Sequence, residues 1–424
     1  MLSGSTPISS QEHTIGSFYE AFPYPWRPMY FETISDPQFY PTLIRQEMAR
    51  PQLSEFRDIW VAGCGTNQAL ITALQFPNAH ILGTDVSARS LEICENNAKS
   101  VGVSNLKLEQ QGIMQSNRDS QFDMVICTGV IHHNREPRQC LSRLSAALRD
   151  DGVLELMVYN KFHRREVSAF QGAVRILLAG IDSHRERLSR SRSLARSIEA
   201  IGTMGEYLHG MQRMPDEVWA DNCINPYETS YDLDSLWSMA EESGLTIEVP
   251  RINVFDKAKN RFLWTLDISD PYLSDAFFSL DDRPRWQVVN LLRLDTSPML
   301  WFILRPDRDG TGTRVSEADR NRIFLDSVLE KPSAVRHRYV LDDDGTYKLS
   351  SHGTLIREMI PKAEMRAIWD RADGKRTVRE IFAELDLSHD FNVVYKARLM
   401  LTSAEFPHLV AHMPPWAPQC ARGL

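Results

Sequence analysis

Two glycines and one aspartate carry the clearest chemical signal in this sequence. Gly63 and Gly65 follow the apolar run 58–62, and Asp85 closes a second apolar run, 22 residues after Gly63. Glycines at such a turn let a ligand approach the backbone, and a carboxylate after the next strand can accept hydrogen bonds from ribose hydroxyls. The spacing predicts the first βαβ unit of a nucleoside-binding sheet, with a glycine turn that holds no ligand as the alternative.

The residues around this turn narrow the choice of nucleoside. A dinucleotide fingerprint would have a third glycine where this chain has Gln68, and no Gly-Lys-Ser/Thr of a P-loop follows. A ligand with an adenosine but no pyrophosphate fits better. S-adenosylmethionine is such a ligand, and its carboxylate can meet the N–H groups at the start of a helix. An oxidoreductase that binds nicotinamide is kept as a minor alternative, because Rossmann-like sheets host many chemistries.

Two adjacent histidines are the candidates for proton transfer. His132 and His133 follow the predicted strand 122–128, at the edge where open α/β sheets bind ligands. An imidazole titrates near neutral pH and could take a proton from an acceptor, and His133 is the preferred candidate. The alternative is that one imidazole caps the next helix while the other packs.

Aromatic and polar residues further along the chain are candidates for the acceptor pocket. The segment 18–28 is rich in aromatics and prolines, which predicts a short helix that passes into an extended stretch. This stretch could be a lid over the cofactor mouth or a packed strap. The candidates, each of which could equally be ordinary packing, are Tyr19, Tyr24, Trp26, Tyr159, Asn160 and Tyr231.

Alternating strand and helix signals predict an α/β fold with a mostly parallel sheet and helices on both faces. The predicted strands are 58–62, 80–84, 106–110, 122–128, 152–158, 245–249 and 299–304, and the predicted helices of the core are 66–76, 87–100 and 137–149. A helical insertion interrupts the sheet after its fifth strand. Its arginine cluster within 185–196 is interpreted as a solvated helix face rather than an RNA site.

The same signals divide the chain into units. The expected units are an N-terminal lid or strap (1–50), a cofactor-binding core (51–161), a helical substrate cap (162–240), completion of the core sheet (241–306), a linker (307–320) and an accessory module (321–424). In the last unit, helices near 363–372 and 378–385 flank an Asp-Gly turn, with Thr377 as a helix cap. We expect this small, mostly helical module to be winged-helix-like.

Composition limits the remaining classes. A net charge of −8 gives no general electrostatic footprint for nucleic acid. The six cysteines contain no C-x-x-C pair, so no disulfide framework or metal site is expected, and a reduced cytoplasmic setting follows. The N-terminal residues do not resemble a signal peptide, and no run approaches the ~18 apolar residues of a membrane span.

Three motifs in order resemble the class I S-adenosylmethionine-dependent methyltransferases. They are the glycine motif 61–66, the acidic second-strand motif 83–87 and the fourth-strand segment 122–133. Within 15–305 the chain more loosely resembles a bacterial subgroup of unassigned substrate. The stretch 373–377 is similar to small PqqD-like modules that hold peptide substrates.

The resemblance implies a role for each matching position. Gly63 and Gly65, with Cys64 between them, would line the methionine part of the cofactor, and Asn67 and Gln68 could contact its carboxylate or amine. Asp85, beside Val86, would bind the ribose, and Thr128 and Gly129 would pass beneath the sulfonium. The family's usual acid for the adenine amine is replaced by the tripeptide 111–113, which leaves Ile113, Gln111 or backbone groups to hold the adenine.

The resemblance implies a methyltransferase that moves a methyl group by in-line displacement and leaves S-adenosylhomocysteine. The expected acceptor is a small molecule or a peptide. The protein is not expected to bind nucleic acid or to associate with a membrane, and a homodimer is one expected oligomeric state. The alternatives are an RNA methyltransferase and a non-catalytic cofactor sensor or assembly protein.

Overall fold

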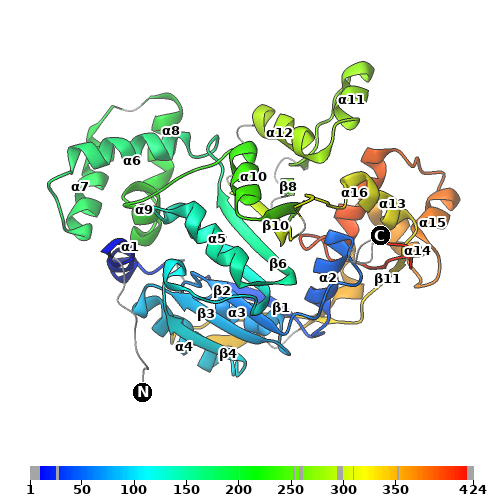
Figure 1. Ribbon diagram of the computed structural model, residues 1–424, viewed down its shortest axis with the longest axis horizontal. Coiled ribbons are helices and arrows are strands. Elements are labelled where there is room, and N and C mark those ends of the chain that lie inside the picture. The colour runs from blue at the N-terminus through cyan, green and yellow to red at the C-terminus, as the bar shows by residue number, and fades with distance from the viewer. Residues whose placement is uncertain are drawn as a thin grey trace.

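The computed structural model describes residues 10–24, 28–199, 201–251, 254–256, 261–293, 299–308, 310–350 and 353–417. A central sheet runs through the middle, with a helical group at each end of the molecule (Figure 1). The candidate residue Trp26 lies outside the described residues.

The central sheet has seven strands among the described residues, and its arrangement confirms the predicted α/β class. The strands, in spatial order, are β4 (Leu106–Gln110), β3 (His80–Asp85), β2 (Asp58–Ala62), β5 (Phe122–Thr128), β6 (Leu148–Tyr159), β10 (Met299–Pro306) and β7 (Leu245–Pro250). Strands β2 to β6 pair in parallel, whereas β10 is antiparallel to β6 and β7. All seven predicted strands are present.

Alternate residues of the strands face two helical layers, as a pleated sheet requires. Ile59 and Val61 of β2 pack under α2 (Phe39–Met48), α3 (Gln68–Gln75) and α4 (Ala88–Ser100). Trp60 and Ala62 face α5 (Pro137–Ala147), α10 (Leu233–Glu242) and α12 (Asp282–Leu292). Apolar side chains on both faces explain why these strands have near-continuous hydrophobic sequences.

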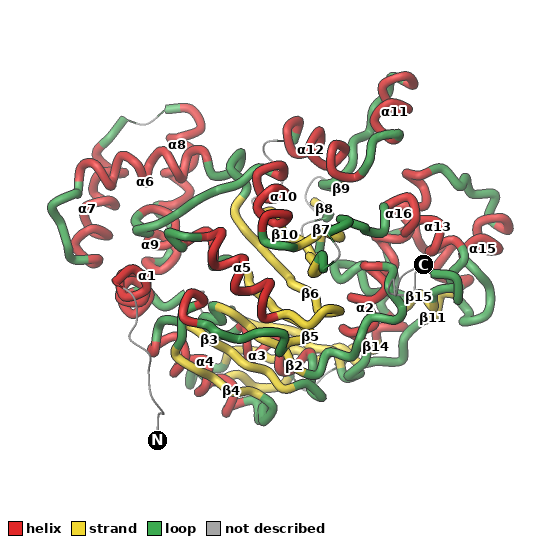
Figure 2. Tube along the Cα trace, in the orientation of Figure 1, coloured by secondary structure: helices red, strands yellow, loops and turns green. Residues whose placement is uncertain are grey.

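The predicted helical insertion follows β6 and forms one end of the molecule (Figure 2). It contains α6 (Arg165–Leu177), α7 (His184–Ser197), α8 (Gly202–Met211) and α9 (Asp216–Cys223). These helices share an apolar cluster with Phe18 and Phe22, which border the end of α1 (Ser10–Ala21). In the arginine-rich helix α7, Arg192 pairs with Asp216 at 2.9 Å and lies over the ring of Trp219.

The C-terminal region mixes helices with short strands. Its helices are α13 (Glu317–Leu325), α14 (Ala363–Arg371), α15 (Val378–Glu384) and α16 (Phe391–Thr402), with a 3-10 turn at Ile356–Glu358. The Thr377 hydroxyl accepts a hydrogen bond from the Glu380 amide at 3.2 Å, as a helix cap does. Strand β11 (Val328–Glu330) pairs with β15 (Val410–His412), and two further short strands, β8 (Phe255–Asp256) and β9 (Arg261–Phe262), lie beside α11 (Pro271–Phe278) in sequence.

The N-terminal segment and the C-terminal region share a sheet. Strand β1 (Tyr30–Ile34) pairs antiparallel with β12 (Val335–Leu341), which also pairs with β13 (Tyr347–Leu349) and β14 (Thr354–Leu355). Nothing in the local sequence predicted this pairing. The C-terminal region is therefore built onto the segment that precedes the core.

A buried ionic cluster also joins these parts of the chain. Glu248 of β7 is fully buried and contacts Arg50, Arg305 and Arg320 at 2.8, 3.2 and 3.3 Å. Arg314, within the predicted linker 307–320, donates to the carbonyls of Ile247 and Glu248. The linker's second half is thus held against the core.

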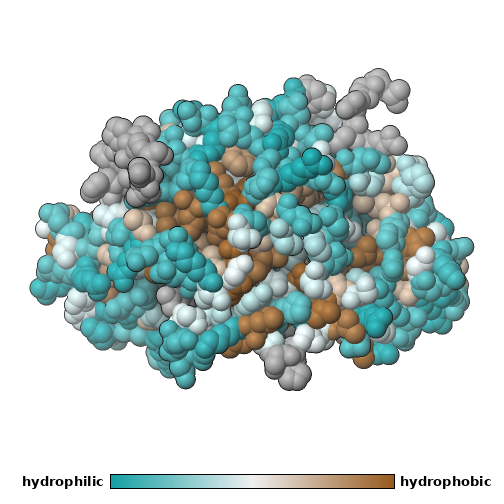
Figure 3. All heavy atoms as spheres, turned by 90° about the horizontal axis from the view of Figure 1, so that it is seen from below, coloured by the Kyte–Doolittle hydropathy of each residue, from teal (hydrophilic) through white to brown (hydrophobic). Residues whose placement is uncertain are grey.

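One face of the molecule has hydrophilic residues around its edge. On the face seen from below, hydrophobic residues gather toward the middle and hydrophilic residues surround them (Figure 3).

Candidate active site

A cavity of 980 Å³ opens at the carboxyl ends of the central strands, where open α/β sheets bind ligands. Every residue predicted to bind the cofactor lines it. These residues are Gly63, Cys64, Gly65, Asn67, Gln68, Asp85, Val86, Ile113, Thr128 and Gly129. The motifs that are separated in sequence therefore meet around one space.

The glycine turn needs its glycines for conformation and for space. Gly63 and Gly65 have φ of 71° and 54°, in the left-handed region that side chains disfavour. A Cβ on Gly63 would lie 2.4 Å from Cγ2 of Val130, closer than atoms can pack. The bare backbone forms a cradle against which a flat or extended ligand could lie.

Gly63→Ala is expected to lower the free energy of unfolding by more than the ~1–2 kcal/mol of left-handed strain alone, because it adds a clash with Val130. Gly102→Ala is the matched control, since Gly102 has φ of 74° and open space around its Cβ position. Denaturant unfolding of both variants measures the difference. Equal losses would show that the space beside Gly63 is not constrained.

Asp85 holds the turn and still faces the cavity. Its two carboxylate oxygens accept hydrogen bonds from the amides of Gly65 and Ser87, both at 2.9 Å. Burial raises the pKa of Asp85, and these two hydrogen bonds oppose that rise. Because a carboxylate has about four lone-pair sites, it can accept hydroxyl hydrogen bonds in addition.

The adenine end of the predicted site contains Gln111 and Ile113 in place of an acid. Ile113 begins a short 3-10 turn, η1 (Ile113–Gln115), and lines the cavity with Gln111. Arg118 donates a hydrogen bond to the side-chain oxygen of Gln111, which fixes the orientation of this amide. An apolar surface and an oriented amide could replace the missing carboxylate.

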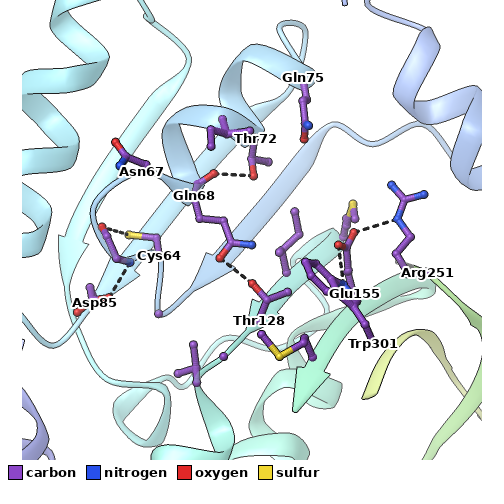
Figure 4. Close-up of a pocket in the computed structure, with 18 of the residues that line it drawn as sticks. Cys64, Asn67, Gln68, Thr72, Gln75, Asp85, Thr128, Glu155, Arg251 and Trp301 are labelled. Carbon is purple, nitrogen blue, oxygen red and sulfur yellow. Dashed lines mark hydrogen bonds and ion pairs between the residues drawn. The ribbon is translucent and has the colours of Figure 1, made fainter. Parts of the chain in front are cut away.

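A polar bridge crosses the cavity at its centre. The Thr128 hydroxyl donates to the side-chain oxygen of Gln68 at 2.8 Å (Figure 4). Cys64 and Asp85 lie on one side of this bridge, and Glu155, Trp301 and Arg251 lie on the other. The sequence analysis did not include this second set among the site residues.

His133 lies in a buried cluster at the cavity wall. It ends the 3-10 turn η2 (Ile131–His133), and its Nδ1 lies 3.0 Å from the carbonyl oxygen of Tyr227. A carbonyl only accepts, so Nδ1 carries the proton and Nε2 keeps a lone pair. Nε2 lies 3.6 Å from Oδ1 of Asp221, which would pair with the imidazolium once His133 gains a proton.

Asp221, which sequence reasoning missed, organises the surrounding hydroxyls. It is 1% exposed, and it accepts hydrogen bonds from Tyr19 at 3.1 Å and Tyr159 at 3.2 Å. Burial, followed by the charge of Asp221, raises the pKa values of Tyr19 and Tyr159 well above the ordinary value. The two phenols therefore stay protonated and act as donors to Asp221.

The other sequence candidates fall into two groups. Tyr19, Tyr24 and Tyr159 line the cavity. Asn160 and Tyr231 do not, because their backbones form a bridge with each other beneath the insertion. Both of these side chains belong to the packed interior.

His132 also lies outside the cavity lining. It is fully buried and packs on the ring of Tyr159, with 4.0 Å between centroids. Neither ring nitrogen has a hydrogen-bond partner within the described residues. Burial lowers the pKa of His132 well below its ordinary value, so the ring is neutral near pH 7. We keep only His133 as a catalytic candidate.

Glu155 and Arg251 are further cavity residues that the sequence analysis missed. Glu155 accepts hydrogen bonds from Trp301 Nε1 at 3.0 Å and Arg251 Nε at 3.4 Å. A charged residue within the apolar run 153–159 was the available signal for Glu155. Asp221 had no such signal, because α9 brings it to the site from the insertion.

Comparison with known proteins identifies the central domain. A family described as a methyltransferase domain matches residues 60–154. An uncharacterized protein of Synechococcus sp. is 27% identical over 312 residues, which cover 70% of this chain and 72% of that protein. The structure of PKMT2 from Rickettsia typhi in complex with AdoHcy aligns with a TM-score of 0.56 at 12% identity, over 92% of this chain and 77% of that one.

A second relative, which aligns over a shorter part of the chain, has a name that refers to tRNA. The tRNA U34 carboxymethyltransferase of Campylobacter jejuni subsp. doylei is 27% identical over 152 residues. The match covers 34% of this chain and 51% of that enzyme.

The domain match and the fold define a class I S-adenosylmethionine-dependent methyltransferase. The methyltransferase domain at residues 60–154 and the fold together support S-adenosylmethionine as the methyl donor. The glycine cradle and the carboxylate of Asp85 fit an adenosyl group, because the bare backbone lets the ligand approach and the carboxylate can accept hydrogen bonds from ribose hydroxyls.

Membrane-spanning helices and metal-binding clusters are both absent from the described residues. None of the helices found there has the length and apolar character needed to cross a membrane. The same residues contain no group of three or more His, Cys, Asp or Glu side chains arranged to hold a metal ion.

Proposed function

We propose that the chain methylates a small molecule or a peptide at an O–H or N–H group, with His133 as the general base. The observation that carries this proposal is the single cavity that contains both the Gly63 to Asp85 cradle and His133. S-adenosylmethionine supplies an activated methyl group, so the protein mainly has to align the reactants and exclude water. In the transfer, the acceptor atom bonds to the methyl carbon while the carbon–sulfur bond breaks.

The donor's position follows from the cavity lining. Asp85 would accept hydrogen bonds from the ribose hydroxyls, and Ile113 with Gln111 would hold the adenine. The Gly63 turn would lie along the methionine part, close to the amide of Gln68. Thr128 and Gly129 would border the sulfonium, so that the methyl group faces the shared wall of the cavity.

Proton removal is assigned to His133. Its Nε2 would take the acceptor's proton, and the carboxylate of Asp221, 3.6 Å away, would stabilise the resulting imidazolium. Tyr19 and Tyr159 hold Asp221 in place through their hydroxyls. A carboxylate acceptor would need no base, so the proposal applies to hydroxyl and amine acceptors.

Asp85→Ala should weaken S-adenosylhomocysteine binding by about tenfold or more, because a hydrogen bond to a charged group contributes roughly 1.5–3 kcal/mol. Asp123→Ala is the matched control. Asp123 also accepts two backbone hydrogen bonds, from Arg57 and Asp58, yet it does not line the cavity. Calorimetry on both variants measures the affinities, and equal losses would remove Asp85 from the donor site.

A tRNA acceptor is the second candidate, and the Campylobacter relative's name favours it. The net charge of −8 argues against it, since binding to nucleic acid depends on cationic surface. Some other expectations from the sequence stay predictions: a homodimer, a cytoplasmic setting and a peptide-holding role for residues 321–424.

The acceptor class can be tested with methyl-tritiated S-adenosylmethionine. The purified chain is incubated with three fractions from cells of the source organism: small molecules, proteins and RNA. We expect label in the small-molecule fraction or in peptides. Label in RNA would contradict this proposal and support a tRNA acceptor. No label in any fraction would favour a non-catalytic protein that binds the cofactor.

A further inference from the structure

The part of the cavity beyond the Gln68–Thr128 bridge extends into the interior of the fold. It lies between the sheet and the helices α2 and α3, with Thr72 and Gln75 of α3 facing Glu155 and Trp301 across the space (Figure 4). We call this part the inner arm. The depth of the inner arm can be measured along strand β5. Thr128, which pairs with Met157 of β6, lies at the bridge, and the lining residue Met124 lies four residues earlier in the strand. Four residues of strand span roughly 13 Å.

The inner arm is lined by side chains that would otherwise form a closed core. Phe39, Leu43, Phe76, Met124 and Ile126 all line it and are at most 5% exposed. Protein interiors are close-packed, and voids much larger than a water molecule are few. These apolar walls would favour contact with an apolar ligand over contact with a charged one.

The whole cavity is large for a single ligand. Pockets of ~300–1,000 Å³ hold one drug-sized molecule. At 980 Å³ the cavity lies at the top of that range, and Cys64 and Asp85 of the donor cradle lie on one side of the Gln68–Thr128 bridge. The inner arm lies on the other side of the bridge, where a second molecule could sit beside the donor.

The charges of the inner arm select against anions. Both arginines that line it already contact carboxylates: Arg251 contacts Glu155 and Glu47, and Arg336 contacts Glu32. The lining carboxylates Glu32, Glu155 and Glu405 outnumber these two arginines. An anionic ligand would meet excess negative charge, whereas a neutral or cationic ligand would not.

We propose that the inner arm binds the methyl acceptor, and that this acceptor is an elongated, largely apolar small molecule that is neutral or cationic. This inference rests on the proposed transferase function and names its substrate class. The reacting end would lie at the Gln68–Thr128 bridge, where the donor and the inner arm meet. The polar end would contact Glu155, Trp301 and Arg251.

The walls of the inner arm come from distant parts of the chain. The C-terminal region contributes Arg336 of β12 and three residues that follow α16: Ala404, Glu405 and Pro407. The remaining walls belong to the core and to α2. The C-terminal region would thus help to choose the acceptor directly. This role differs from recruitment of a peptide by a separate module.

A pair of fluorescent probes tests the inner arm on the full chain. N-phenyl-1-naphthylamine is neutral and apolar, and 8-anilino-1-naphthalenesulfonate has the same skeleton with an added sulfonate. We expect saturable binding of the first probe in the presence of saturating S-adenosylhomocysteine. The sulfonate should bind about tenfold more weakly or worse, because burying an unpaired anion is costly.

Gln75→Trp should fill the inner arm and weaken N-phenyl-1-naphthylamine binding by about tenfold or more, equivalent to at least 1.4 kcal/mol. Its affinity for S-adenosylhomocysteine should stay within about twofold of the parent. Asn96→Trp, on the exposed surface of α4, is the matched control and should change neither affinity. Ile71→Trp, one helical turn before Gln75, serves if Gln75→Trp fails to fold.

Three results would overturn the inference: probe binding that competes with S-adenosylhomocysteine, probe binding unchanged in the filled variant, or equal binding of the sulfonate. Failure of the proposed function would look different. In that case the chain would bind the neutral probe in the inner arm but would not bind S-adenosylhomocysteine.

Discussion

His133→Ala is expected to lower methyl transfer by about 10²- to 10⁴-fold, the usual contribution of a positioned general base. The Nε2 lone pair that faces Asp221 disappears in this variant, so the proposed proton acceptor is lost. Affinity for S-adenosylhomocysteine should stay unchanged. The rate is measured with tritiated donor and the acceptor fraction that the parent enzyme labels.

Chemical rescue separates a catalytic role of His133 from a packing role. Added imidazole can occupy the vacated space and restore part of the rate if a proton acceptor is what the variant lacks. A parallel fall in rate and in S-adenosylhomocysteine affinity, without rescue, would instead assign His133 to the structure of the cavity wall.

Glu248→Gln should lower the free energy of unfolding by about 3–5 kcal/mol, because it leaves buried arginines without their shared carboxylate. Burial alone would raise the pKa of Glu248, but Arg50, Arg320 and Arg305 outweigh it and lower the pKa. The carboxylate's contribution is therefore present at neutral pH and is lost as pH falls through this lowered pKa. Denaturant unfolding at pH 7 measures the loss.

Glu242→Gln provides the control for this prediction. Glu242 pairs with Arg138 on the surface, where both side chains are more than half exposed. A surface ion pair contributes roughly 0–1 kcal/mol, so this variant should unfold almost like the parent. If the Glu248 variant lost no more stability than the Glu242 variant, the buried cluster would not join the C-terminal region to the core.

The core sheet could be predicted because its signals are local. The apolar run 58–62, the glycine turn and Asp85 fall within one βαβ unit, and spacing alone orders them. Ser87 begins the predicted helix 87–100, and its hydroxyl accepts a hydrogen bond from the Ser90 amide at 3.1 Å, as a helix cap does. Helix α3 begins two residues later than predicted, since the tight turn extends through Asn67.

Long-range pairing could not be predicted in this way. The pairing of β1 with β12 joins segments about 300 residues apart, and neither sequence specifies its partner. Asp221 reaches His133 only because the insertion folds back over the sheet. The candidates Tyr231 and Asn160 are joined by a backbone bridge and do not line the cavity, and their position could not be predicted from a polar residue at a strand end.

A crystal structure of the full chain with S-adenosylhomocysteine tests the central claim most directly. We predict the ribose on Asp85, the adenine beside Ile113 and the amino-acid part along the Gly63 turn, with the inner arm left open to a second molecule. A ligand whose adenosyl group lay in the inner arm, or a cradle at Gly63 and Asp85 that stayed empty at saturating ligand, would contradict the account.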